Sequence, residues 1–137
     1  MRRILSLLIV AFVTVTLTVL FSGPASALGG ETFGCNVQPN TPSHSGFPGV
    51  CTTGRAAGGY VVTFEVFNIT AGESFSWSGP SLVQGTLSNC NTSVCRVSLS
   101  ASTDVDVTVS VIISQAGARE TLSARVIIPA VCGRIFC

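Results

Sequence analysis

His44 is the only histidine of the chain and the first residue to consider for chemistry. It stands between Ser43 and Ser45, and a serine beside a histidine base that a carboxylate orients is the arrangement of nucleophilic hydrolases. Adjacent residues on a flexible loop cannot by themselves hold the base and the nucleophile in that geometry. The sequence therefore favours a solvated loop histidine and predicts a protein that is not an enzyme.

The carboxylates offer a second possibility. Asp104 and Asp106 alternate along the chain and would share one face of a strand, where they could bind calcium together with loop carbonyl groups. The alternative, which the sequence favours, is a solvated strand face whose charges discourage edge pairing. The glutamates are dispersed and form no pair with the spacing of a glycosidase: Glu31, Glu65, Glu73 and Glu120. We expect no metal and no cofactor.

Six cysteines are the strongest chemical signal in the sequence: Cys35, Cys51, Cys90, Cys95, Cys132 and Cys137. An even number in a small exported chain indicates three disulfides, and the lack of any C-x-x-C pair argues against zinc. Because short loops close most easily, the favoured pairs are Cys35–Cys51, Cys90–Cys95 and Cys132–Cys137. In the alternative pairing, Cys35 or Cys51 ties the N-terminal segment to the C-terminal tail.

Residues 1–27 have the pattern of a helical signal peptide. Arg2 and Arg3 precede an apolar run from Ile4 to Phe21, and Ala25-Ser26-Ala27 presents small residues where a signal peptidase cuts. We expect cleavage after Ala27, which leaves no segment long enough for membrane insertion; the alternative is an uncleaved N-terminal anchor. Both readings place the rest of the chain outside the cytoplasm, either secreted or at the cell surface.

The charge balance narrows the choice of partners. Charged residues make up 9% of the 137 residues and the net charge is +1, whereas a typical soluble chain has about 25%. All of the basic residues are arginine. Such a chain provides no basic field for nucleic acid and no polybasic patch for a membrane surface.

The rest of the chain reads as one all-β domain. Residues 28–59 are rich in glycine and proline and form a loop-rich, disulfide-tethered segment, with short strands near 33–37 and 49–53. Alternating apolar residues predict strands at 60–70, 75–77, 97–99, 104–114 and 119–128, with a weaker one at 82–87. About six or seven short strands indicate an antiparallel β-sandwich over residues 60–137. Its expected core includes Phe64, Trp77, Val107, Val109 and Val126.

The last two long strands predict their own register. A loop at 115–118 would set Ser114 opposite Arg119, which pairs Val111 with Leu122. Every inward residue of 104–114 then meets an inward residue of 119–128. On the outer face, Arg125 lies opposite Thr108 and diagonal to Asp106.

The stretch from Phe75 to Pro80, FSWSGP, together with the hairpin at 105–128, resembles immunoglobulin-like and polycystic-kidney-disease-like β-sandwich modules of secreted bacterial proteins. The resemblance covers residues 60–130 and implies that Trp77 is a core residue on a central strand. The chain departs from that pattern in two places. No cysteine lies in the strands at 60–70 and 104–114, so the inter-sheet disulfide of antibody-type domains is absent. Gly79-Pro80-Ser81 also replaces the acidic glycine turn of many such repeats.

The candidate binding loop is the segment from Cys35 to Cys51, with His44 and Phe47. A disulfide-tethered, proline-rich loop is ordered before it binds, which lowers the entropic cost of binding. Phe47 is either an exposed anchor or an aromatic residue packed over the end of the sandwich. Phe75 and Trp77 could form a carbohydrate-stacking platform, although core packing is favoured.

These observations predict a secreted or cell-surface, non-enzymatic module that binds an extracellular protein or a cell-envelope component. The alternative is a small secreted inhibitor of an extracellular enzyme that acts through the 35–51 loop. A secreted hydrolase is a third possibility, disfavoured because the catalytic inventory is so thin.

Overall fold

The computed structural model describes residues 28–44, 46–80 and 90–137, and this part of the chain is all-β. The expected signal peptide at 1–27 and the weak strand expected at 82–87 lie outside the described residues. The one helical element in the described ranges is a short 3-10 turn, η1 (Pro42–His44). None of the described residues belongs to a helix long and apolar enough to cross a membrane.

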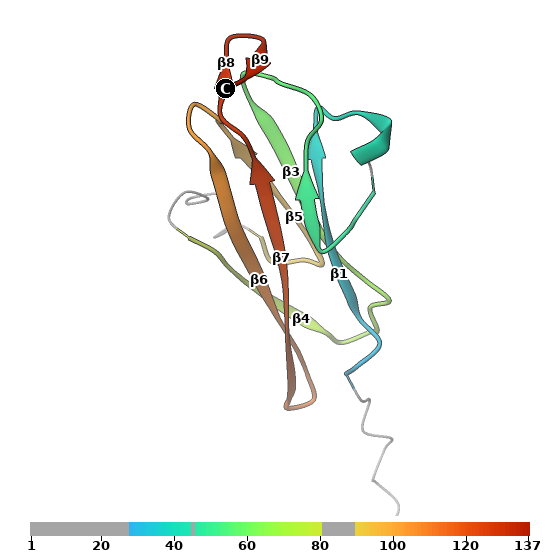
Figure 1. Cartoon of the computed structure of the whole chain (residues 1–137). Coiled ribbons are helices and arrows are strands. Elements are labelled where there is room, and N and C mark those ends of the chain that lie inside the picture. Colours follow the sequence, from blue (N-terminus) through green and yellow to red (C-terminus); the bar gives the residue numbers. More distant parts are fainter. Residues whose placement is uncertain (1–27, 45, 81–89) are drawn as a thin grey trace, which may run out of the picture.

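The strands form two main sheets and one small ribbon (Figure 1). The first sheet has the order β1-β3-β5, with β1 at Thr32–Gln38, β3 at Tyr60–Phe67 and β5 at Val94–Leu99. The second has the order β2-β7-β6-β4, with β2 at Val50–Thr52, β4 at Ser74–Ser78, β6 at Val105–Gln115 and β7 at Ala118–Ile128. A C-terminal ribbon pairs β8 (Val131–Cys132) with β9 (Ile135–Phe136).

The β6–β7 hairpin has the predicted register. Ser114 pairs with Arg119, and Val111 pairs with Leu122. The connecting loop is shorter than expected, since Gln115 and Ala118 pair with each other and leave only Ala116 and Gly117 in the turn. Both have positive φ, 50° and 89°, which is the primed turn whose twist matches that of the flanking strands. The alternation of side chains therefore predicted the register correctly, and the hairpin has one more residue pair than expected.

The core lies between the two main sheets. In β3 the side chains of Tyr60, Val62, Phe64 and Val66 are buried, and the buried positions of β6 and β7 also alternate. Four of the expected core residues are 0–2% exposed, which confirms that part of the prediction: Phe64, Val107, Val109 and Val126. A single cluster of buried side chains includes residues of both sheets, so the sheets pack face to face through these apolar faces.

Trp77 departs from the expectation in one respect. Its strand, β4, is the outermost of the described strands in its sheet, not a central one. The side chain is half-buried and packs against the core, with its ring 5.6 Å from that of Phe33 and 6.5 Å from that of Phe64. Its indole N–H donates to the carbonyl oxygen of Thr92 at 2.9 Å. Trp77 therefore packs against the edge of the core and is partly buried, which agrees with the expected core packing only in part.

The segment 28–59 contributes more than loops. β1 supplies seven residues that pair with every residue of β3 except Tyr60, and its Cys35 and Val37 are buried in the core. β2 adds a short parallel strand beside β7. Apart from Gly34, which lies within β1, the glycines and prolines of this segment fall outside the two strands. The two short strands that the sequence allowed near 33–37 and 49–53 are both present.

The three disulfides join the pairs that the sequence favoured. Cys90–Cys95 and Cys132–Cys137 are local clips, the second across the β8–β9 ribbon. Cys35–Cys51 does more than close a loop, because Cys35 lies in β1 of the first sheet and Cys51 in β2 of the second. The fold thus has an inter-sheet disulfide, at a position different from that of antibody-type domains.

Phe64→Ala tests this core against a matched change on the same strand. Phe64 is fully buried, whereas Val61 on the opposite face of β3 is 42% exposed. We expect Phe64→Ala to lower the free energy of unfolding by about 3–5 kcal/mol, because it leaves a cavity between the sheets. Val61→Ala should lower it by less than about 1 kcal/mol. Urea denaturation of the oxidised protein measures both, and equal losses would contradict the assigned faces of β3.

Candidate functional site

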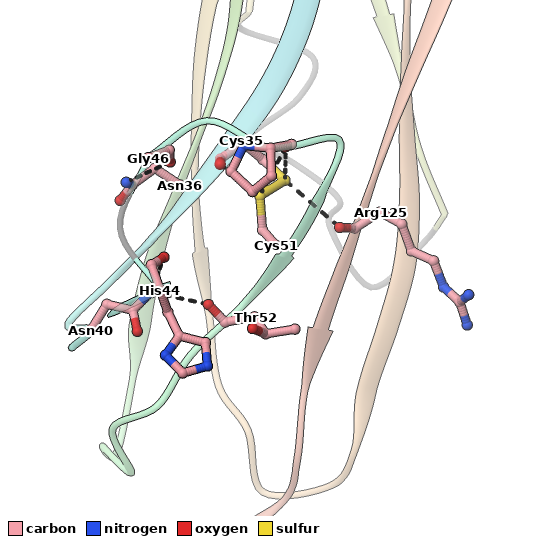
Figure 2. The surroundings of a disulfide bond; sticks show 9 residues. Cys35, Asn36, Asn40, His44, Gly46, Cys51, Thr52 and Arg125 are labelled. Carbon is pink, nitrogen blue, oxygen red and sulfur yellow. Dashed lines mark hydrogen bonds between the residues drawn. A yellow bond between two sulfur atoms is a disulfide. The ribbon is translucent and has the colours of Figure 1, made fainter. Parts of the chain in front are cut away.

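The 35–51 loop is fixed at both ends to the two sheets (Figure 2). The disulfide holds the Cα atoms of Cys35 and Cys51 5.9 Å apart, and both residues are buried. The Cys35 N–H donates to the carbonyl oxygen of Pro48 at 3.1 Å, and the Arg125 N–H donates to that of Gly49 at 2.8 Å. The returning arm of the loop is therefore bonded both to β1 and to β7.

Asn40 organises the interior of the loop. Its side-chain N–H groups donate to the carbonyl oxygens of His44 at 2.9 Å and Thr52 at 3.0 Å. Its side-chain oxygen accepts from the N–H groups of Thr41 at 2.8 Å and Gly54 at 2.9 Å. One side chain therefore satisfies four backbone groups of the turn, as asparagine commonly does in loops.

A second asparagine closes the base of the loop. The Asn36 side chain donates to the carbonyl oxygen of Gly46 at 2.8 Å (Figure 2). Gln38 in turn donates to the side-chain oxygen of Asn36 at 3.1 Å. The loop is thus bonded across its width as well as along its arms. A loop with this many internal hydrogen bonds retains little conformational freedom to lose when it binds.

Phe47 lies over the start of the first sheet. Its ring packs edge-on against Phe67 with 5.2 Å between the ring centroids, yet 39% of the residue remains exposed. Its backbone crosses directly over Gly34, where a Cβ atom would lie 2.0 Å from the Phe47 carbonyl oxygen. Glycine at position 34 is what permits this approach. Phe47 is therefore packed against the sheet and partly exposed, and its role as a binding anchor stays a prediction.

His44 is exposed at the end of η1. Its Nδ1 atom lies 3.0 Å from the Thr41 hydroxyl and 3.0 Å from the Ser43 hydroxyl. Both hydroxyls thus converge on the same ring nitrogen, and Thr41 and Ser43 also bond to each other at 3.1 Å. This is a local turn network within η1, and in the described part of the chain no carboxylate is a hydrogen-bond partner of the imidazole.

The two aspartates have structural partners. Arg125 makes a two-point ion pair with Asp106, with its Nε 2.7 Å from Oδ1. This hydrogen bond, together with the charge of Arg125, holds the pKa of Asp106 below its ordinary value. Asp104 accepts from the Ala130 N–H at 2.8 Å. Within residues 28–44, 46–80 and 90–137, no group of three His, Cys, Asp or Glu side chains could hold a metal ion.

The structure places the two candidate residues on separate parts of one ordered loop. His44 is held by Thr41 and Ser43, while Phe47 lies against Phe67 and above Gly34. Sequence reasoning missed Asn40 and Gly34, which shape the loop. The sequence Asn40-Thr41-Pro42 is typical of a turn and could have indicated Asn40. No local signal marks Gly34, because its partner, Phe47, lies 13 residues further along the chain.

Exposed apolar side chains lie along the returning arm of the loop. Phe47 is 39% exposed and Val50 is 53% exposed, and Pro48 between them is also exposed. We call Phe47, Pro48 and Val50 the apolar arm. It is held in place by the backbone bonds of Pro48 and Gly49 to the two sheets.

Compared with protein-family models, curated proteins and solved structures, the chain matches none of them.

Gly34→Ala tests the crossing of the loop over β1. The added methyl group would collide with the Phe47 backbone, so we expect a loss of about 1–3 kcal/mol in unfolding free energy. We also expect amide chemical-shift changes along the apolar arm. Gly58→Ala is the control, because nothing lies within 4 Å of a Cβ atom there. Thermal denaturation and NMR spectra of both variants give the comparison, and unchanged shifts at the apolar arm in Gly34→Ala would contradict the close approach.

Proposed function

We propose that the protein is an exported, non-enzymatic binding module with an immunoglobulin-like fold, which presents the 35–51 loop to a partner outside the cytoplasm. The partner is an extracellular protein or a component of the cell envelope. The observation that carries the proposal is the apolar arm, an exposed apolar strip on a loop that is bonded to both sheets.

The strand order supports the immunoglobulin-like assignment. In that fold, strands A, B and E lie in one sheet and strands C, F and G in the other. The chain order of the present strands allows β1, β3 and β5 to take the places of A, B and E, and β4, β6 and β7 those of C, F and G. Trp77 then lies on the strand that carries the conserved tryptophan of that fold.

The disulfides support a location outside the cytoplasm. Three of them in a small β protein are typical of oxidising compartments, because cytosolic thiols are kept reduced. The signal-peptide pattern at 1–27 points to the same location.

The rigidity of the loop supports binding through it. The disulfide, the four bonds of Asn40 and the bond of Asn36 to Gly46 order the loop before any partner arrives. A pre-ordered loop with a half-exposed aromatic side chain is suited to act as an anchor at a protein interface. The same property favours the second candidate, a secreted inhibitor that inserts this loop into the cleft of an extracellular enzyme.

Phe47→Ala separates a binding loop from a merely structural one. The oxidised protein, immobilised on beads, is used to recover partners from culture fluid and from solubilised envelope. We expect Phe47→Ala to weaken retention of the recovered partner at least about tenfold, since an aromatic anchor contributes on the order of 2 kcal/mol. Ile135→Ala is the matched control, because Ile135 is 68% exposed and lies in the C-terminal ribbon.

The outcomes distinguish the candidate functions. Loss of binding to an enzyme, together with loss of its inhibition, supports the inhibitor. Loss of binding to an envelope component supports the surface module. If the Phe47→Ala variant and the wild type retained a partner equally well, the loop would not be the binding site. Hydrolysis of a substrate that disappears with His44→Ala would overturn both candidates.

A further inference from the structure

Three buried side-chain oxygens in the described part of the chain lack a hydrogen-bond donor, and all three lie at one end of the second sheet. They are Oε2 of Glu73, Oε1 of Gln115 and Oε2 of Glu120. Glu73 immediately precedes β4, Gln115 ends β6, and Glu120 lies on β7 opposite Ile113. Because β4, β6 and β7 are neighbours, these acceptors occupy adjacent strands. Buried polar atoms nearly always have a partner, so this end of the fold requires an explanation.

Gln115 is fixed so that its free oxygen cannot simply turn away. It is only 8% exposed, and its side-chain nitrogen donates to the Ala71 carbonyl oxygen at 2.9 Å and to the Thr70 hydroxyl at 3.0 Å. The carbonyl of Ala71 can only accept, so the nitrogen must face it and the oxygen must face inward. Thr70 also donates twice to Oε1 of Glu73, at 2.6 and 2.7 Å. Glu73 and Gln115 are therefore locked together by one turn.

A third carboxylate reaches this end of the fold from the segment that leads into the other sheet. Glu31, just before β1, is 9% exposed, and its side chain is within hydrogen-bonding reach of Glu73. The pKa of Glu31 is below its ordinary value, first because the Gly29 N–H donates to its carboxylate, and also because of its own N–H, that of Gly30 and the Glu73 side chain. Two carboxylates this close repel each other unless a positive group or a shared proton lies beside them.

The backbone nitrogen of Leu28 lies near the Glu31 carboxylate. The Gly29 and Gly30 N–H groups lie 2.7 and 3.0 Å from Oε2 of Glu31. The nitrogen of Leu28 is one residue further, hence at most about 6 Å from that oxygen, given a span of about 3.6 Å per residue. The Leu28 side chain packs against Val66, Val111 and Ile113, so residue 28 is anchored at this end of the core.

We propose that the α-ammonium group of Leu28, formed when the leader is cut after Ala27, lies beside Glu31 and is the missing positive partner of Glu73 and Gln115. We call these three residues the acceptor cluster. Hydrolysis of the Ala27–Leu28 peptide bond by water gives a carboxylate on the leader and an ammonium group on Leu28. The folded domain thus contains a binding site for its own processed N-terminus. The proposal rests on the export part of the proposed function and does not require the 35–51 loop to bind anything.

The absence of lysine allows a direct test, because the α-amino group is then the only primary amine of the processed chain. Protein beginning at Leu28 is prepared, and half of it is acetylated with an amine-selective reagent. We expect acetylation to lower the melting temperature by roughly 4 °C, the scale of a single partly buried ion pair. In Glu73→Gln the same acetylation should change the melting temperature by less than about 1 °C.

Glu65→Gln is the matched control, since the Glu65 side chain lies on the face of β3 opposite its buried residues and should keep the full effect of acetylation. An unchanged melting temperature on acetylation of the wild type would overturn the proposal without requiring any variant to fold. An equal decrease in wild type and Glu73→Gln would also overturn it. So would stabilisation by calcium that Glu73→Gln abolishes and acetylation leaves untouched, because the cluster would then be a cation site.

N-terminal sequencing of the exported protein separates this proposal from the proposed function. A different start residue contradicts cleavage after Ala27. Acetylation of protein made to begin at Leu28 still decides whether the acceptor cluster binds an ammonium group. Recovery of a partner through the 35–51 loop does not depend on the sequencing result or on the acetylation result.

Discussion

The Cys35–Cys51 disulfide is the constraint on which the rest of the structure depends. It joins the outer strand β1 of one sheet to the outer strand β2 of the other, and both of its residues are buried. The apolar core holds the sheets face to face, and the disulfide ties the middle of β1, where Cys35 pairs with Phe64, to β2, where Cys51 pairs with Val126 of β7. The 35–51 loop connects the two sheets. Because both of its ends are held, it has little conformational freedom, and its backbone forms hydrogen bonds to both sheets.

Much of the fold follows from local patterns in the sequence. Five apolar residues in alternate positions predicted which face of β6 is buried. The same alternation in β7 left a single register, in which the apolar face of each strand is buried. The disulfide pairs followed from the ease of closing short loops. The ion pair of Arg125 with Asp106 is a consequence of that register, because the two side chains lie diagonally on the outer face of the hairpin.

What the sequence did not predict depends on contacts between distant segments. Glu31 and Glu73 seemed dispersed, yet they meet because β1 and β4 begin at the same end of the two facing sheets. The position of Trp77 at the outer strand depends on which strands pair, and no periodicity reports that. Gly34 shows no signal of its own, since the reason for a glycine is the Phe47 backbone above it. Patterns of alternation describe a strand, whereas these features depend on the neighbours of the strand.

The most direct measurement of the central claim is the unfolding free energy of the Cys35→Ala/Cys51→Ala double variant, compared with that of Cys132→Ala/Cys137→Ala, together with amide hydrogen exchange in the 35–51 loop. We expect a loss of about 3 kcal/mol for the inter-sheet pair. We also expect rapid exchange of the amides at positions 35 and 125, whose N–H groups hold the loop to the sheets. The C-terminal pair should have a smaller effect and leave the loop protected. Equal losses for the two double variants, with protection of the loop unchanged, would contradict the account.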